Sequence, residues 1–311
     1  MAEFRQDPLT GRWTLISPER LRYMFRRQKK VRAKVKPFVP LLQRTYPVPR
    51  SRAALEIHGN AFPAIGPWPN RLPLQTTTNA HVSKRGVGEQ YLVRFSHGRD
   101  ITAASAQERQ AFAKAVAVEF ARLNTNRRVK MVTLFRNNGE AAGASLVPPH
   151  YQLWGVPIPS NAHEQELLWL RRLKTCPTCK LVRQIRPWLV ASNSAGKLYC
   201  PPASQFAGAV TLVPTRHVRS FVLLEKSQQT ALVELLALAL KKLRAQFGDL
   251  AFNEIWHEYL GSDPRTHFRI EILPRLLRPA SLEHGHNFFI NPLIPEKIAR
   301  LLRLKKVRLT Q

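Results

Sequence analysis

The sequence predicts an α+β protein built from two repeats, and two observations support this fold class. The 311 residues are 44% hydrophobic and 9% aromatic, which is enough to form a sizeable core. The order strand, helix, strand occurs twice along the chain. We therefore expect an N-terminal repeat over residues 1–175 and a C-terminal repeat over residues 176–311.

In the first repeat, Pro8 and Gly11 mark a turn that leads into a strand before Pro18. Residues 45–79 are rich in proline and turn-forming residues, so they are expected to be irregular, packed loop. The remaining elements follow from hydrophobic periodicity. They are a strand at 91–96, an amphipathic helix at 106–124, a strand at 130–139, a short strand within 143–159 and a helix at 164–174.

The second repeat shows the same order of elements. Residues 208–217 predict a strand, residues 227–248 a long helix that ends at Gly248, and residues 267–276 a second strand. The two halves agree in the order of their elements more than in their residues, so the order of the elements is what indicates a duplication.

Charge is the most unusual feature of the composition. The chain has 49 Lys and Arg against 20 Asp and Glu, a formal net charge of +29. So many positively charged side chains repel one another in the folded state. The repulsion is best tolerated when a polyanion, most often nucleic acid, neutralises the charge. Three cysteines are too few for a disulfide framework, so we expect a reducing compartment. The sequence predicts no membrane span.

The densest basic segment is the basic arm, residues 20–36, which has nine Lys or Arg and no acidic residue. Its aromatic residues Tyr23 and Phe25 can stack on unpaired bases. A solvated arm without a ligand remains the alternative. The residues expected to contact RNA, in the arm and in later basic clusters, are Arg20, Arg22, Arg26, Arg27, Lys29, Lys30, Arg32, Lys34, Lys36, Arg127, Arg128, Lys130, Arg171, Arg172, Lys241, Lys242, Arg303, Lys305 and Lys306.

Five collinear segments resemble the galactose-1-phosphate uridylyltransferase family of the histidine-triad superfamily. They are residues 7–20, 59–65, 135–159, 212–221 and 267–303. The resemblance covers most of the chain. It implies two histidine-triad-like repeats, each an antiparallel sheet with flanking helices.

The resemblance also implies a catalytic site. The family segment His-Pro-His-x-Gln corresponds here to Pro-Pro-His-Tyr-Gln at 148–152, so that His150 falls on the nucleophile and Gln152 on the residue that contacts the phosphoryl oxygens. An imidazole suits this chemistry because it is neutral and nucleophilic near pH 7. Asn137, Ser145 and Arg20 fall on positions that contact the nucleotide.

Metal ligands of the family are replaced in the first repeat. The resemblance places them at Tyr46, Pro49, Arg99 and Pro148, none of which can serve in a tetrahedral zinc site of nitrogen and sulfur ligands. Because all four differ together, we expect that this site is no longer used, and that the protein has no metal there and no cofactor.

The second repeat carries further departures. Arg269 stands where the family has a histidine, whereas Glu271 is a residue that other members carry there. Cys176 and Cys179 have the spacing of a zinc knuckle, but no second pair follows, so they are weak metal candidates that Cys200 or scattered histidines would have to complete; two free thiols are the main interpretation. The scattered histidines are expected to be hydrogen-bonded structural residues first and ligands second; they are His217, His267, His284 and His286.

Two functional hypotheses follow. The first is an RNA-binding component of the ribosome or another ribonucleoprotein, with a degenerate catalytic site, located in the cytoplasm or in an organellar matrix. Pro148, Tyr23 and Ala61 depart from the family around the site and favour such a pseudoenzyme. The alternative is an active nucleotidyltransferase that acts on a nucleotide sugar through His150.

Overall fold

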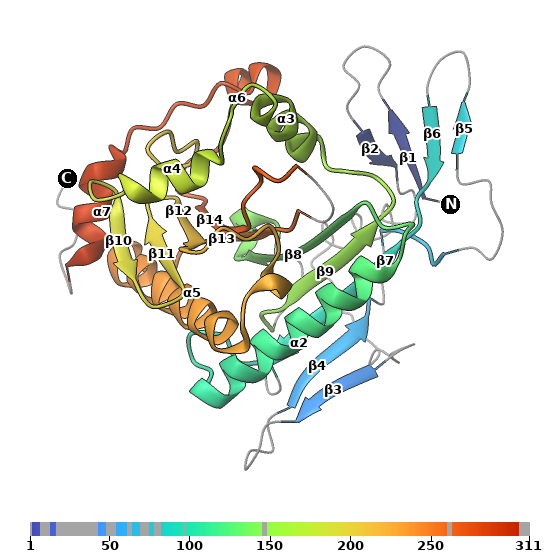
Figure 1. Ribbon diagram of the computed structural model, residues 1–311, viewed down its shortest axis with the longest axis horizontal. Coiled ribbons are helices and arrows are strands. Elements are labelled where there is room, and N and C mark those ends of the chain that lie inside the picture. The colour runs from blue at the N-terminus through green and yellow to red at the C-terminus, as the bar shows by residue number, and fades with distance from the viewer. Residues whose placement is uncertain are drawn as a thin grey trace.

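A computed structural model describes residues 2–6, 13–16, 43–47, 54–60, 64–68, 75–77, 82–95, 98–144, 148–259 and 263–304. Strands β1 to β7 precede helix α2, and helices and strands are interspersed after it. A large curved sheet runs through the molecule, with the long helices α2 and α5 against it (Figure 1). The predicted α+β class is confirmed. Among the described residues, no helix is long and apolar enough to cross a membrane.

The main sheet has ten strands in the order β10-β11-β12-β14-β13-β8-β9-β7-β4-β3, with antiparallel neighbours throughout. The strands of the first half are β3 (Gln43–Pro47), β4 (Ala54–Gly59), β7 (Glu89–Phe95), β8 (Met131–Asn138) and β9 (Tyr151–Val156). Those of the second half are β10 (Leu189–Ser192), β11 (Gly196–Tyr199), β12 (Val210–Pro214), β13 (Phe252–His257) and β14 (Arg269–Pro274). The halves meet where β8 pairs with β13, and Phe135 lies opposite Ile255.

Outward from this central pair, the strands of the first half come in the order β8-β9-β7-β4-β3 and those of the second half in the order β13-β14-β12-β11-β10. Each half thus arranges its five strands in the same way, as two repeats require. A boundary between domains at residue 175 remains a prediction.

A second sheet has four strands in the order β2-β1-β6-β5. They are β1 (Glu3–Gln6), β2 (Trp13–Ile16), β5 (Gln75–Thr77) and β6 (Val82–Arg85). The expectation of irregular loop over 45–79 is therefore wrong, since β3, β4 and β5 fall within or at the edge of this range. Proline misled the prediction because β3, which ends at Pro47, is an edge strand where proline is tolerated.

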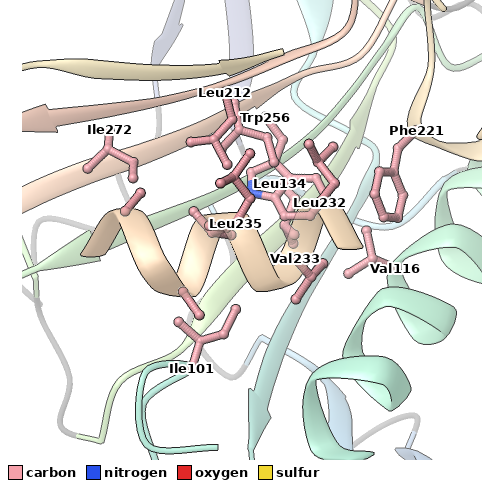
Figure 2. Close-up of a cluster of buried hydrophobic side chains, with 14 of the residues drawn as sticks. Ile101, Val116, Leu134, Leu212, Phe221, Leu232, Val233, Leu235, Trp256 and Ile272 are labelled. Carbon is pink, nitrogen blue, oxygen red and sulfur yellow. The ribbon is translucent and has the colours of Figure 1, made fainter. Parts of the chain in front are cut away.

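Helices α2 (Ala106–Thr125) and α5 (Lys226–Phe247) cover one face of the main sheet. Ser105 caps α2 in a capping box with Glu108, and Gly248, at φ 77°, ends α5 in a conformation that glycine adopts readily. Between helices and sheet lies the core, where α5 residues pack on Leu134, Leu212 and other strand residues (Figure 2).

The shorter helices are α3 (Asn161–Leu170), α4 (Pro177–Arg183), α6 (Ser281–His286) and α7 (Pro295–Arg303), with 3-10 turns η3 (Glu140–Ala142) and η4 (Phe221–Leu223). The helix predicted at 164–174 is α3, shifted toward the N-terminus. Ser160 accepts a hydrogen bond from the amide of His163 and so starts the helix earlier than expected.

The helix-facing side of the central strands contains buried charge as well as apolar residues. Arg136, only 1% exposed, pairs with Asp100, which Arg244 also contacts at 3.1 Å. Glu254, on the adjacent strand, is fully buried and accepts a hydrogen bond from Tyr151 at 3.4 Å. Buried polar contacts therefore stabilise the core between the sheet and the helices, together with apolar packing.

Candidate functional site

A cleft of about 430 Å³ lies along β8 and β13 on the face of the sheet that α2 and α5 leave open. Side chains alternate in direction along a strand, so Val132 and Leu134 pack into the core while Phe135 and Asn137 point to the open face. Phe135, Asn137 and Asn253 all line the cleft. The open face therefore carries the polar residues that a ligand can meet.

His150 lies on the same open face, one residue before β9. Gln152 lies opposite Phe135 in the pairing of β8 with β9, and continuing this register by two pairs places His150 opposite Asn137. His150 is 9% exposed. This register places three residues that the sequence predicted for the site on the same face of the sheet: His150, Gln152 and Asn137.

The orientation of the His150 ring follows from a contact with the backbone. Its Nδ1 lies 3.1 Å from the carbonyl oxygen of Pro148. A carbonyl can only accept, so Nδ1 carries the proton and Nε2 keeps its lone pair. Gly98, at φ 66°, lies against the Pro148 ring, and a Cβ there would stand 2.6 Å from the Cβ of Pro148. Glycine at this position thus allows the proline to approach closely.

The environment of His150 favours the neutral imidazole. Burial lowers the pKa of His150 below its ordinary value, and the nearby cations Arg136 and Arg94 lower it further, against the opposing hydrogen bond to Pro148. A neutral imidazole with a free Nε2 is the form that can attack an electrophile at neutral pH.

Gln152 is positioned by a residue that sequence reasoning did not find. Nε2 of Gln90, on β7, lies 3.5 Å from Oε1 of Gln152, while Oε1 of Gln90 accepts a 2.9 Å hydrogen bond from the amide of Ala64. The fixed Gln90 amide thereby leaves the NH2 group of Gln152 available for a ligand oxygen.

Asn137 is held from the second half of the chain. Its Oδ1 accepts a 2.8 Å hydrogen bond from Nδ2 of Asn253, and Oδ1 of Asn253 accepts in turn from Nε of Arg275. Asn253 and Arg275 line the cleft together with Asn137. No local motif marks Asn253 or Arg275 in the sequence, because their role depends on the pairing of β8 with β13.

In the second half, Arg269 stands at the position that corresponds to His150, and it belongs to an ion-pair network. Arg269 donates to Glu271 from Nε and to Glu166 from Nη1, both at 2.9 Å, and His257 lies 2.9 Å from Glu271. Tyr259 donates to Glu166 at 2.5 Å. A guanidinium cannot serve as a nucleophile, so the replacement predicted at Arg269 leaves this position without the histidine chemistry of His150.

Comparison with known proteins shows which proteins the chain is similar to. No protein-family model matches the chain. The chain is 23% identical to galactose-1-phosphate uridylyltransferase from Thermotoga maritima, over 99% of its length and 100% of that protein. It is 25% identical to ADP-glucose phosphorylase from Arabidopsis thaliana, over 56% of this chain and 52%, about half, of the relative. Its relatives are galactose-1-phosphate uridylyltransferase-like proteins.

Solved structures with this fold include a uridylyltransferase, with a TM-score of 0.79 at 21% identity over 97% of both chains. An ADP-glucose phosphorylase from Arabidopsis thaliana with bound ADP-glucose gives a TM-score of 0.75 at 22% identity, over 99% of this chain and 100% of the other. These values confirm the predicted uridylyltransferase-like fold.

A candidate metal centre lies apart from His150 in this uridylyltransferase-like chain. Cys176, Cys179, His217 and His267 each offer one ligand atom, and these atoms all lie within 4.8 Å of one another. Sγ of Cys176 is 3.6 Å from Nδ1 of His267. Zinc ligands at about 2.3 Å for sulfur and about 2.0 Å for nitrogen stand roughly 3.5 Å apart in a tetrahedron. The donor set therefore fits Zn²⁺.

Both histidines of this centre are oriented as metal ligands. Nε2 of His217 lies 2.8 Å from the carbonyl oxygen of Pro264, and Nε2 of His267 lies 3.1 Å from that of Pro214. The carbonyls fix the protons on Nε2 and turn both Nδ1 lone pairs toward the sulfurs. Burial lowers the pKa of His267 to about 4, so this ring is neutral at physiological pH. Four protein ligands are typical of a structural zinc site.

The structure thus revises the expectations for the cysteines and histidines. His217 and His267, and not the buried Cys200, complete the set with Cys176 and Cys179. The main interpretation of two free thiols is no longer favoured. His284 and His286 lie in α6 and are exposed.

The remaining predicted residues divide into three groups. Arg20, Ser145, the basic arm at 20–36, Lys305 and Lys306 lie outside the described residues. Arg127, Arg128, Lys130, Arg171, Arg172 and Lys241 are exposed on several different elements. Lys242 instead donates to the carbonyl of Leu302 at 2.7 Å, and Arg303 to that of Leu189 at 3.1 Å. These two side chains join α5 and β10 to α7.

Proposed function

We propose that the protein is a nucleotidyltransferase that takes a nucleoside monophosphate from a nucleotide sugar and carries it on His150. The observation that carries this proposal is the contact between Nδ1 of His150 and the carbonyl of Pro148, which leaves Nε2 free to attack. The cleft beside it, lined by Asn137 and Asn253, offers room for the nucleotide sugar.

The reaction has two displacements at the same phosphorus. In the first, Nε2 of His150 forms a bond to the α-phosphorus while the bond to the bridging oxygen breaks, and the sugar phosphate leaves with the electron pair. In the second, an oxygen of the acceptor, either phosphate or a sugar phosphate, attacks the phosphorus and the bond to Nε2 breaks. Gln152 can donate a hydrogen bond to a non-bridging oxygen in both steps.

Replacement of a histidine by Pro148 does not argue against activity. The group that orients His150 is the backbone carbonyl of residue 148, and every residue type supplies it. The site therefore keeps the nucleophile, its tautomer and the neighbouring amides Gln152 and Asn137. This retained geometry supports an active enzyme over the pseudoenzyme favoured by the sequence.

The comparisons suggest the class of donor. The relatives are a uridylyltransferase and an ADP-glucose phosphorylase, and the latter has been solved with ADP-glucose bound. We therefore take UDP-glucose and ADP-glucose as the first donors to test.

The test is covalent labelling with donors that carry ³²P at the α-phosphorus. We expect acid-labile, base-stable label on the wild-type protein, mapped to His150 by mass spectrometry. His150→Ala should abolish the label, while His284→Ala, at an exposed histidine of α6, should keep it. Wild-type protein that takes no label from either donor would contradict the proposal.

A second candidate function, binding of RNA in the ribosome or another ribonucleoprotein, is favoured by the net charge of +29. This excess remains unexplained by nucleotide-sugar chemistry, which needs only a few cations near the phosphates. The two functions are compatible, because the exposed basic residues at 127–130 and 171–172 lie outside the cleft.

A further inference from the structure

Arg94 is a cation beside His150 that the motif around the histidine does not contain. In the pairing of β7 with β9, Val93 lies opposite Tyr151, so the next step of the register places Arg94 opposite His150. Val93 and Phe95 are buried in the core, and alternation turns Arg94 to the open face with His150. Directly opposed residues have Cβ atoms about 4.5–5.5 Å apart.

Glu56 anchors the guanidinium of Arg94. Both Nε and Nη2 of Arg94 lie 2.8 Å from Oε2 of Glu56, on the adjacent strand β4. His58 contacts the same oxygen at 2.9 Å. Burial would raise the pKa of Glu56, but the hydrogen bonds from His58 and Arg94 lower it, so the carboxylate stays charged.

This anchoring leaves one part of the guanidinium available. Within the described part of the chain, Nη1 of Arg94 has no hydrogen-bond partner, and the side chain is 42% exposed. Because Glu56 already fixes the plane of the group, little further conformational entropy is lost when a ligand binds. An arginine held in this way is suited to the oxygens of a phosphate.

We propose that Arg94 is a catalytic residue that binds the non-bridging oxygens of the phosphoryl group transferred to His150. The proposal rests on the proposed nucleotidyl transfer for its role in the reaction. Negative charge is concentrated on these oxygens as Nε2 of His150 bonds to phosphorus and the bridging oxygen departs, and Arg94 stabilises it without giving or taking a proton.

Arg94 also affects the protonation of His150. The groups that act on the imidazole are the carbonyl of Pro148, Arg136 on β8 and Arg94 on β7, whose partner Glu56 lies on β4. Burial is the largest cause of the lowered pKa of His150, and both arginines add to it. Removing the charge of Arg94 should therefore raise the pKa of His150.

The first experiment measures binding, so that it does not depend on turnover. We would titrate wild type, Arg94→Gln and Arg94→Lys with AMP and UMP, and with adenosine and uridine, by calorimetry. Arg94→Gln should weaken monophosphate binding by about tenfold or more, the scale of a charged hydrogen bond, and leave nucleoside binding unchanged. Arg94→Lys should lie between, because lysine is a point donor. Arg186→Gln, at an exposed site on the turn after α4, is the control.

The second experiment measures labelling of His150 by the ³²P-donors and the pKa of its ring by NMR titration. Arg94→Gln should slow labelling by about tenfold or more and raise the ring pKa. Equal monophosphate affinity in wild type and Arg94→Gln, or an unchanged ring pKa, would overturn the role of Arg94 even if both label. Loss of monophosphate affinity without any labelling of wild type would uphold Arg94 and reject nucleotidyl transfer. If wild type binds no monophosphate, both proposals fail.

Discussion

Sγ of Cys179 lies 3.2 Å from Nδ1 of His217, although 38 residues separate them in the sequence. The two meet because α4 begins at Pro177, directly after Cys176, and His217 follows the end of β12. In the first half, Arg99 follows β7 and Pro148 precedes β9, just as His217 follows β12 and His267 precedes β14. The second half thus carries histidines where the first half does not.

We expect one zinc per chain, bound by Cys176, Cys179, His217 and His267. Cys179→Ser should lose the metal and reduce the free energy of unfolding by about 4 kcal/mol or more, because loss of a structural metal is among the largest single effects. Elemental analysis and urea unfolding measure the two outcomes. Cys200→Ser, at a buried cysteine outside the set, is the matched control and should keep the zinc.

The metal centre shows where sequence-based prediction reached its limit. The Cys-x-x-Cys spacing of Cys176 and Cys179 is visible in the sequence. Its partners were not, because His217 and His267 are brought to the cysteines by the pairing of β12 with β14. Tertiary contacts of this kind leave no local pattern.

The candidate active site divides in the same way. His150, Gln152 and Asn137 could be found from a linear motif and its neighbourhood, and the register of β8 and β9 places them on the same face of the sheet. Arg94, Gln90 and Asn253 could not, since they reach the site through strand pairing. The long helices and central strands were predicted well because their periodicity is regular, whereas the short strands of 43–77 lie among prolines.

Glu258 should make the stability of the protein depend on pH. It is buried, accepts hydrogen bonds from Ser220 and from the amide of Phe221, and burial raises its pKa to about 8. Because the pKa of Glu258 is higher in the folded state, the folded protein favours the protonated carboxyl. The stabilisation from this group is therefore complete below about pH 4.5 and is lost as the pH rises to about 8.

Glu258→Gln removes this titration. Relative to wild type, the variant should gain stability steadily between pH 5 and pH 8, by at most about 5 kcal/mol over the whole shift. Urea unfolding across this range measures the difference, in which the titration of other groups cancels. Glu140→Gln, at an exposed site, should run parallel to wild type. A constant difference between Glu258→Gln and wild type would show that Glu258 does not titrate in this range.

Asp100 should have the opposite dependence. Burial would raise its pKa, but Arg136, the amide of Thr102 and Arg244 hold the pKa of Asp100 well below its ordinary value. The stabilisation from the Asp100 carboxylate is therefore complete above about pH 4. It is lost as the pH falls from there toward the lowered pKa of the folded state. Asp100→Asn leaves Arg136, which is 1% exposed, without its carboxylate partner.

We expect Asp100→Asn to reduce the free energy of unfolding by about 3–5 kcal/mol at pH 7, the scale of breaking a buried ion pair. The loss should shrink toward pH 3, because below about pH 4 the unfolded wild-type chain takes up a proton on Asp100 that the folded chain does not. Asp249→Asn, at an exposed site, is the control and should change stability little at either pH. A loss that is equal at pH 7 and pH 3 would mean that the carboxylate charge contributes nothing.

The basic arm at 20–36 lies outside the described residues, and its role follows from its charge. If it binds RNA, each phosphate contact releases a counterion and adds about 0.7 to 0.9 to the slope of log affinity against log salt. Replacing Arg26, Arg27, Lys29 and Lys30 with Ala should lower that slope by about three units, provided that all four contact phosphates. Filter binding to single-stranded RNA between low and moderate salt measures the slope.

Labelling of His150 by a nucleotide sugar should be unchanged in this variant, because none of the four residues lies in the predicted catalytic segment. An unchanged slope would show that the arm is solvated and that the charge of +29 has another use.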